Sequence, residues 1–254
     1  MSRSIEDLLH RRTDLSTFLV HLTRTDHNGQ ARDRLFSILM NGMLQLGRPM
    51  GMAAGPAVER QEAQPEFYMS QQVICFTETP LEHAWMMCED IANRQVQFEP
   101  YGIAVTRTWG RQHRLNPVWY LDITPGHDWL TQPVNRMIEE ALAVGQFEAD
   151  VFRITPYIEQ MGPTASARKE FWWEREWRLA GRELLFTPID LVAVLVPAED
   201  HVTFRAALEG LRQQAGIAPE WFANARLIDP RWGLERIIAS LASVPEAMAG
   251  PFPV

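Results

Sequence analysis

The chain has 254 residues, of which 46% are hydrophobic and 22% charged, so it is long enough to bury a large core as a globular protein. Its net charge of −8 argues against a surface coated by nucleic-acid backbone, although it does not exclude a local basic groove. The longest apolar run, LVAVLVPA at 191–198, is too short to span a membrane. The N-terminus is not a signal peptide, so we expect a cytoplasmic protein with no membrane partner.

The first half of the chain predicts short elements of both kinds. In order, they are a helix capped by Ser4, a strand at 17–24, a helix at 31–44 that Gly42 stops, and strands at 72–77 and 101–107. Residues 46–70 are rich in Gly, Pro and Ala and predict a long loop. The segment TPLEHAWMMCEDI predicts a helix with Thr79 as N-cap, Pro80 in the first position and Glu82 closing a capping box.

The second half continues the mixture. Up to residue 181 we predict, in order, a turn or short helix at 108–115, a strand at 116–123, a helical pattern at 133–160, a loop at 161–170 and a strand at 171–181. After it we predict a strand at 190–197, an amphipathic helix at 198–216, a short strand at 225–229 and a helix at 233–243. The tail at 245–254 should be loosely held. Strands and helices do not alternate regularly, which is typical of the α+β class. We expect a single domain over 1–254, with a core at about 17–197 and a C-terminal helical extension at 198–254 that packs on it.

The common catalytic signatures are absent from the sequence. It contains no dinucleotide-binding or P-loop glycine motif, no nucleophile elbow and no metalloprotease helix motif. Cys75 and Cys88 match no zinc spacing and build no disulfide framework, and we interpret them as buried thiols. We therefore expect no metal.

Two short motifs are candidates for a binding role. His21 and Thr23 fall on one face of the first strand, where an imidazole and a hydroxyl can hold sugar hydroxyls or a phosphate. The alternative for His21 is a satisfied core histidine. Glu78 lies where a strand ends and a helix begins, which favours a structural role at the helix N-terminus over an acid role in a cleft.

The segment FWWEREWRLAG at 171–181 combines tryptophans with alternating charges. As a strand, it would place Trp173 and Trp177 on an apolar face and Glu174, Glu176 and Arg178 on the other. A solvated edge strand is the simpler interpretation of the charged face. The tryptophans favour a packed strand instead, whose charged face would line a cleft.

The order of these motifs resembles the abortive-infection antitoxin family AbiGi, a group of bacterial phage-defence proteins. The resemblance covers about residues 18–182, and CFTETPL and YGIAVTRTWGRQHRLNPVWYL are its most specific parts, whereas EREWR is shared more widely. It implies a role in phage defence, as part of a toxin–antitoxin pair, with a cognate toxin or antitoxin protein as partner.

More remotely, the layout is similar to ADP-ribosyltransferase-like domains, including the DarT group that modifies DNA. That similarity implies a split, twisted, mainly antiparallel sheet with flanking helices that clasps NAD as a substrate. It also implies that Glu176 stabilises positive charge on the nicotinamide ribose, while Glu174 orients or deprotonates an acceptor. The acceptor would be a nucleic acid or a protein.

The same similarity implies the residues that hold NAD. His21 would bind a ribose with Thr23 beside it, and Phe76 or Tyr101 would stack on nicotinamide. Arg178 would pair with a carboxylate or with the pyrophosphate. The motifs of arginine-specific transferases and the two-histidine pattern of RNA phosphotransferases are missing.

Two functions of different classes follow. The first is an enzyme that transfers ADP-ribose from NAD to a macromolecule or hydrolyses NAD. The second is a catalytically inactive antitoxin or sensor that binds a toxin partner or a nucleotide, for which the acidic chain suits a basic partner. A metal-dependent nuclease is a third, weaker possibility, because the acidic residues are too scattered to define a metal site.

Overall fold

The structure is a computed structural model that describes residues 14–27, 29–91, 94, 96–164, 168–215 and 225–244. The chain forms two compact units. Unit 1 comprises Met1–Gly42, Glu78–Gly110 and Phe186–Val254, and unit 2 comprises Met43–Thr77 and Arg111–Leu185. The expected N-terminal helix at Ser4 and the tail at 245–254 lie outside the described residues. Because the chain passes between the units several times, no single composition shift marks a boundary.

Unit 1 contains four neighbouring strands, in the spatial order β12 (Leu227–Ile228), β11 (Leu191–Leu195), β4 (Gly102–Thr106) and β1 (Phe18–Leu22). The pairs β1/β4 and β4/β11 are antiparallel, whereas β11/β12 is parallel. The expected strands at 17–24, 101–107, 190–197 and 225–229 are therefore confirmed. The central strand β4 is buried on both faces, which explains why GIAV is continuously apolar.

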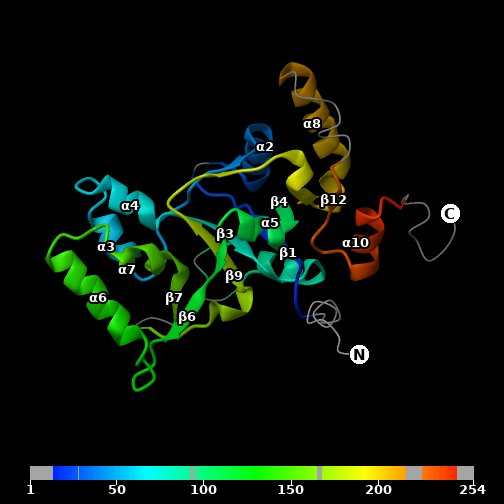
Figure 1. The fold of residues 1–254 in the computed structure, drawn as a ribbon. Helices are drawn as coiled ribbons and strands as arrows, with labels where there is room; N and C mark the ends of the chain where they lie inside the picture. The colour runs from blue at the N-terminus through cyan, green and yellow to red at the C-terminus, as the bar shows by residue number, and fades with distance from the viewer. Residues whose placement is uncertain are drawn as a thin grey trace, which may run out of the picture. The chain divides into compact units, whose positions relative to one another are not determined.

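Helices flank these strands in unit 1 (Figure 1). They are α2 (Ala31–Asn41), η1 (Leu81–Cys88), α5 (Arg107–Gln112, of which the last two residues fall in unit 2), η4 (Pro188–Asp190), η5 (Ala198–Asp200), α8 (His201–Ala215) and α10 (Leu234–Leu241). Gly42 ends α2 in the left-handed conformation, with φ 57°, as expected from the sequence. Phe36 of α2 stacks on Phe204 of α8 with ring centroids 4.4 Å apart, which joins the two helices.

The helix expected at Thr79 begins later and is of another type. Residues Leu81–Cys88 form a 3-10 helix, and its boundary residue Pro80 is extended, with ψ 143° and no side-chain cap. Because Pro80 is itself extended and occupies the boundary position, Thr79 lies one residue too early to be the N-cap. Thr79 is instead buried, as is Glu78, whose carboxylate accepts a 2.8 Å bond from Arg107. The capping box with Glu82 was therefore a wrong prediction.

Unit 2 contains three small groups of strands. They are β3 (Val73–Thr77), β9 (Glu176–Ala180) and β5 (Asn116–Pro117) in one; β6 (Trp119–Asp122), β7 (Ile158–Pro163) and β8 (Arg168–Lys169) in the next; and β2 (Met43–Leu44) with β10 (Leu184–Leu185) in the last. Among the described residues of unit 2, β6/β7 is the one parallel pair. Across the described residues the pairing is mainly antiparallel, so the α+β class with a mainly antiparallel sheet is confirmed.

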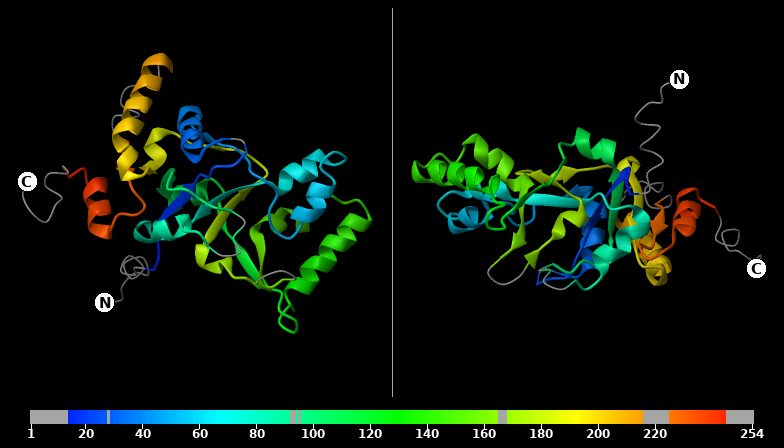
Figure 2. Two further views of the ribbon diagram at one scale, coloured as in Figure 1. Left: turned by 180° about the vertical axis from the view of Figure 1, so that it is seen from behind. Right: turned by 90° about the horizontal axis from the view of Figure 1, so that it is seen from below.

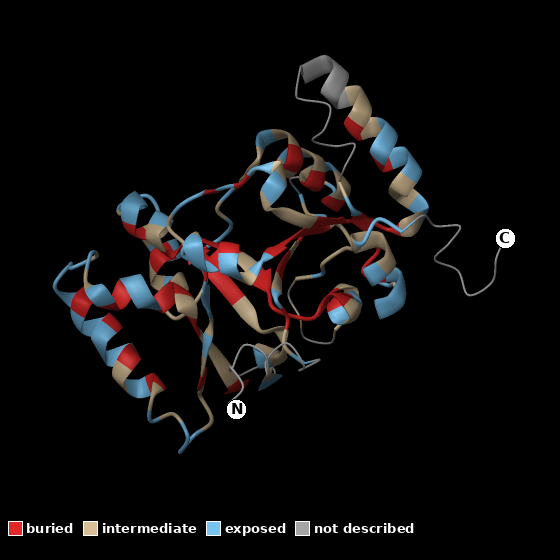
Figure 3. Cartoon of the chain, turned by 45° about the vertical axis from the view of Figure 1, so that its right-hand side comes forward, coloured by how far each residue is buried: buried red, intermediate tan, exposed pale blue. Residues whose placement is uncertain are grey.

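The helices of unit 2 surround a small core of their own. They are α3 (Ala54–Glu59), α4 (Pro65–Gln71), α6 (Thr131–Ala143), α7 (Asp150–Ile154), η2 (Thr155–Tyr157) and η3 (Phe171–Glu174). Phe67 of α4 meets Phe152 of α7 edge to face, and Ile138 of α6 joins the same cluster. Figure 3 shows buried residues concentrated along the strands, while helices alternate buried with exposed positions.

The loop expected at 46–70 was a wrong prediction, since it contains α3 and α4. Gly51 explains the tight packing there, because a Cβ at this position would lie 2.0 Å from the Thr155 carbonyl oxygen. Ala53 and Ala57 are fully buried in the apolar cluster of unit 2. Small residues in this segment therefore reflect packing, and at Gly51 a close backbone approach, rather than a loop.

Three further expectations were only partly right. The strand expected at 116–123 divides into β5 and β6, which pair with different partners. The helical pattern at 133–160 breaks after α6 and ends before β7, and the loop expected at 161–170 contains the end of β7 and all of β8.

The segment FWWEREWRLAG is a strand only in its second half. Residues Phe171–Glu174 form the 3-10 turn η3, and Arg175 adopts the left-handed conformation, with φ 49°. Alternation between faces therefore begins at Glu176, and the expected shared face of Glu174 and Glu176 is wrong. Figure 2 shows this part of the chain from two further sides.

We predict that Trp177→Ala lowers the free energy of unfolding by about 3–5 kcal/mol, because the indole is 7% exposed and belongs to the core. Trp172→Ala is the matched control in the same segment. Its side chain is 57% exposed, so the loss should be at most about 0.5 kcal/mol. Urea denaturation of both variants measures the difference, and equal losses would contradict the packing described for β9.

Candidate functional site

The charged residue at the centre of unit 2 is Arg178, in the middle of β9. It lies opposite Cys75 of β3 in the antiparallel pair, and its side chain is fully buried. A buried guanidinium requires hydrogen-bond partners for its N–H groups and a compensating negative charge.

Three elements provide these partners. Glu176 accepts two parallel bonds, from Nε at 2.9 Å and from Nη2 at 2.7 Å. Glu159 of β7 accepts a bond from Nη2 at 2.8 Å, and the carbonyl oxygen of Pro156 accepts one from Nη1 at 2.8 Å. We call Arg178, Glu176, Glu159 and Lys169 the Arg178 cluster.

The charges of the Arg178 cluster balance. Lys169 donates to the second oxygen of Glu159 at 2.9 Å, so two cations face two carboxylates. Burial alone raises the pKa of Glu159, but Arg178 and Lys169 outweigh it and hold that pKa below its usual value. Burial alone lowers the pKa of Arg178, and Glu176 raises it above its usual value, so the guanidinium stays charged.

Two uncharged groups border this cluster. The hydroxyl oxygen of Tyr120 is buried and has no hydrogen-bond partner among the described residues. Burial raises the pKa of Tyr120, and the carboxylates of Glu176 and Glu174 raise it further. Burial likewise raises the pKa of the Cys75 thiol, with Glu176 adding to the effect, so Cys75 is held as a neutral thiol rather than a nucleophilic thiolate.

The remaining expected residues of unit 2 serve the fold. Phe76 is 2% exposed and lies opposite Trp177 in the strand pair, so its ring is part of the core. Glu174 is in η3, and its carbonyl oxygen accepts a hydrogen bond from the Thr77 hydroxyl of β3. That bond holds the turn that precedes Glu176, the residue that pairs with Arg178.

In unit 1 the structure brings together His21, Thr23 and Tyr101. His21 pairs with Ile103 in the β1/β4 register, and the Thr23 N–H donates to the Tyr101 carbonyl oxygen at 2.8 Å. The Thr23 hydroxyl donates to the carbonyl oxygens of Ala31, at 2.8 Å, and Tyr101, at 3.1 Å. This hydroxyl therefore connects β1 to the start of α2. The expected site residues thus fall into two groups, one in each unit.

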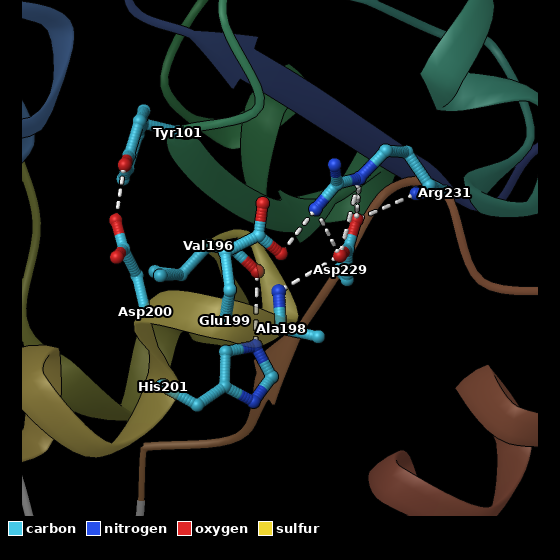
Figure 4. Close-up of polar contacts among 8 residues, drawn as sticks. All are labelled: Tyr101, Val196, Ala198, Glu199, Asp200, His201, Asp229 and Arg231. Carbon is cyan, nitrogen blue, oxygen red and sulfur yellow. Dashed lines mark hydrogen bonds and ion pairs between the residues drawn. The ribbon is translucent and has the colours of Figure 1, made fainter.

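A second polar cluster, centred on Asp229, lies in unit 1 and was not expected from the sequence (Figure 4). Asp229 directly follows β12, and its 2% exposed carboxylate accepts a 2.8 Å bond from the Ala198 N–H at the start of η5. Arg231 donates to both of its oxygens, at 2.9 Å from Nε and 2.7 Å from Nη2, and also bonds Glu199 at 2.7 Å. Burial raises the pKa of Asp229, but the bonds from Arg231 and Ala198 outweigh it and lower that pKa.

His201 and Tyr101 border the Asp229 cluster (Figure 4). The Nε2 atom of His201 lies 2.9 Å from the Val196 carbonyl oxygen, and the ring meets Trp232 edge to face at 5.2 Å. The Tyr101 hydroxyl donates to Asp200. The segments VLVPAED and ARLIDP contain the signal that could have located this site, because each places a carboxylate just beyond a buried strand. The carboxyl ends of parallel strands meet at one edge of a sheet.

Among the described residues, no group of three or more His, Cys, Asp or Glu side chains is placed to hold a metal ion. In the same part of the chain, no helix is long and apolar enough to cross a membrane.

The fold defines an α+β protein with a mainly antiparallel sheet. It has a buried ion-paired cluster around Arg178, and a buried carboxylate, Asp229, whose cation Arg231 is half exposed. Residues 65–189, slightly less than half of the chain, match the family model described as "Putative abortive phage resistance protein AbiGi, antitoxin". The match includes the whole Arg178 cluster. No curated protein and no solved structure matches the chain.

We predict that Arg178→Leu destabilises the protein by about 3–5 kcal/mol, because it leaves Glu176 buried without its cation and Glu159 with Lys169 alone. Arg168→Leu is the control, since its ion pair with Glu170 is exposed and should contribute at most about 1 kcal/mol. Chemical denaturation at neutral pH measures both. A small loss for Arg178→Leu would show that the carboxylates have access to water.

We predict that His201 makes the protein less stable in mild acid. Burial lowers the pKa of His201, and Arg205 and Arg236 act in the same direction, against the Val196 carbonyl oxygen and Asp229. The unfolded state therefore takes up the proton first, and stability falls as pH drops below about 6.5. His201→Gln should reduce the fall of the urea midpoint between about pH 7.5 and 5.5. His127→Gln, at an exposed position, should leave that pH dependence as in the wild type.

Proposed function

We propose that this protein is the antitoxin-type component of an abortive phage-resistance system and that it acts by binding a partner protein. The match of residues 65–189 to the AbiGi model supports a role in phage defence, and the description of that model as an antitoxin supports the antitoxin role. The observation that carries the proposal is the pairing of Glu176, the expected catalytic carboxylate, with Arg178 through both of its oxygens.

A carboxylate that stabilises a cationic transition state must direct its field at the reacting carbon. At Glu176 that field is largely cancelled by a guanidinium at 2.7–2.9 Å. Freeing the carboxylate would leave Arg178 buried with Glu159 as its remaining anion. The pair therefore favours a carboxylate that maintains the fold over one that performs turnover.

The test compares the wild type with Glu176→Gln, which retains a hydrogen-bond acceptor for Arg178. We expect both proteins to relieve the growth arrest caused by the toxin encoded beside the gene, to co-elute with that toxin, and to leave NAD unconsumed. The proposal fails if folded Glu176→Gln, with an unchanged circular dichroism spectrum, no longer protects the cells while the wild type consumes NAD.

The second candidate is an enzyme that transfers ADP-ribose from NAD to a nucleic acid or protein, or hydrolyses NAD. It is favoured by the 12% exposure that the Glu176 side chain retains. In this reaction Glu176 would stabilise the cationic ribose and Glu174 would act on the acceptor. The Thr23 hydroxyl, expected at a ribose, instead donates to two backbone carbonyl oxygens in unit 1.

Thermal unfolding with NAD separates the two candidates, since a ligand at about 100 times its Kd stabilises the native state by about 2.7 kcal/mol. The enzyme candidate requires a concentration-dependent rise in Tm, and nicotinamide release that Glu176→Gln lowers by about two to three orders of magnitude. No rise and no release would eliminate it.

A further inference from the structure

Four large apolar side chains on two neighbouring elements of unit 1 are exposed. Trp85 and Met86 of η1 are each 40% exposed, and Leu234 and Ile238 of α10 are 50% and 54% exposed. The helix α10 packs against η1, and the ribbon views show the two side by side (Figures 1 and 2). We call these four residues the η1–α10 surface.

The geometry of η1 keeps Trp85 and Met86 off its buried edge. A 3-10 helix has three residues per turn, so residues three apart share an edge. Leu81, Ala84 and Met87 form the buried edge, and Trp85 shares the next edge with Cys88. Trp85 and Met86 therefore lie outside the edge that faces the core, on the element that α10 contacts.

The helix α10 has a wider apolar stripe than unit 1 covers. Leu234, Ile237, Ile238 and Leu241 recur at helical spacing, but only Ile237, at 2% exposure, is fully covered. Leu234 and Ile238 flank it and remain half exposed. Exposed apolar residues that adjoin one another and include Trp and Met are typical of protein-binding surfaces.

The exposed charges beside this surface are mainly acidic. Residues 81–91 contain three carboxylates and no Lys or Arg. Glu89 and Asp90 are exposed, as is Glu235 on α10, and none of the three makes an ion pair among the described residues. The cation on α10, Arg236, lies over the Trp232 ring at 4.1 Å. Arg94 donates to the Met87 carbonyl oxygen of η1 at 2.7 Å and lies over the Phe98 ring. A complementary ligand therefore carries positive charge.

We propose that the η1–α10 surface binds a basic amphipathic segment of a partner protein, with apolar side chains against Trp85 and Ile238 and Lys or Arg facing Glu89, Asp90 and Glu235. The proposal deepens the partner-binding function and rests on it. Helical segments of this kind bind through apolar anchors at helical spacing, and acidic surroundings raise their association rate.

The probe is a labelled peptide of about 18 residues, or five turns, with leucine and lysine in an amphipathic pattern. Its counterpart has glutamate in place of lysine. Fluorescence anisotropy with the full chain should show binding of the lysine peptide, weaker at about 200 mM than at about 50 mM salt. Equal binding of the glutamate peptide, or no binding of the lysine peptide, overturns the proposal.

Two pairs of variants locate the binding. Trp85→Ala with Ile238→Ala should weaken it by about tenfold or more, whereas Val202→Ala, at an 80% exposed position on α8, should leave it unchanged. Glu89→Gln with Asp90→Asn should reduce both the affinity and its salt dependence. Glu139→Gln with Glu140→Gln on α6 removes equal charge elsewhere, and an equal loss there would show general attraction to an acidic protein instead.

Two further results separate partner binding at this surface from self-association and from partner binding elsewhere on the protein. If a second copy of the chain occupies the surface, light scattering will show twice the monomer mass, and Ile238→Glu will restore the monomer. That pair of results overturns the proposal. If the surface variants still co-elute with the toxin and protect cells, the surface is wrong while the partner-binding function stands. If the peptide binds as expected but the wild type does not protect cells, the proposed function fails on its own.

Discussion

The buried guanidinium of Arg178 is the constraint around which unit 2 is arranged. Removing such a charge from water costs several kcal/mol unless its partners are well placed. Those partners are Glu176 on β9 itself, Glu159 on β7 and the Pro156 carbonyl oxygen in η2. Because the last two lie in adjacent elements, the end of η2 and the start of β7 are fixed beside β9. The conformations of Arg175 and η3 follow from the same requirement, since they bring Glu176 into the strand.

Unit 1 likewise contains a buried charge, in this case a negative one. The carboxylate of Asp229 is buried at the carboxyl ends of the parallel strands β11 and β12, where the N-terminal turn of η5 begins. The N–H of Ala198 and the guanidinium of Arg231 stabilise its ionised form. A helix N-terminus favours negative charge, so the same bond that satisfies Asp229 also fixes the start of the helical segment that continues into α8.

The sequence predicted the elements whose patterns are local. The strands at 18–22, 73–77, 102–106 and 191–195 and the helix that Gly42 ends were visible because apolar and turn residues recur at fixed spacing. Residues 46–70 were misjudged because Gly51 is required by a close approach to Thr155, about a hundred residues away along the chain. The alternation rule failed at Glu174 because Arg175 is left-handed. Arginine rarely adopts that conformation, so the residue type gives no sign of it in the sequence.

The same distinction explains what could be foreseen of the site. EREWR drew attention to Glu176 and Arg178, and the structure places them together, but their partner Glu159 lies in another element and has no motif. A charged face opposite tryptophans can be a cleft or an internal ion-paired layer, and only the position of the opposing carboxylate decides between them. Here the charges balance inside unit 2, so they stabilise the strand and leave little field for a ligand. Charge that a partner could recognise is instead found where carboxylates stay exposed, as at Glu89 and Asp90. Under the proposed function, the interior charges hold the fold rigid and the surface charges select the partner.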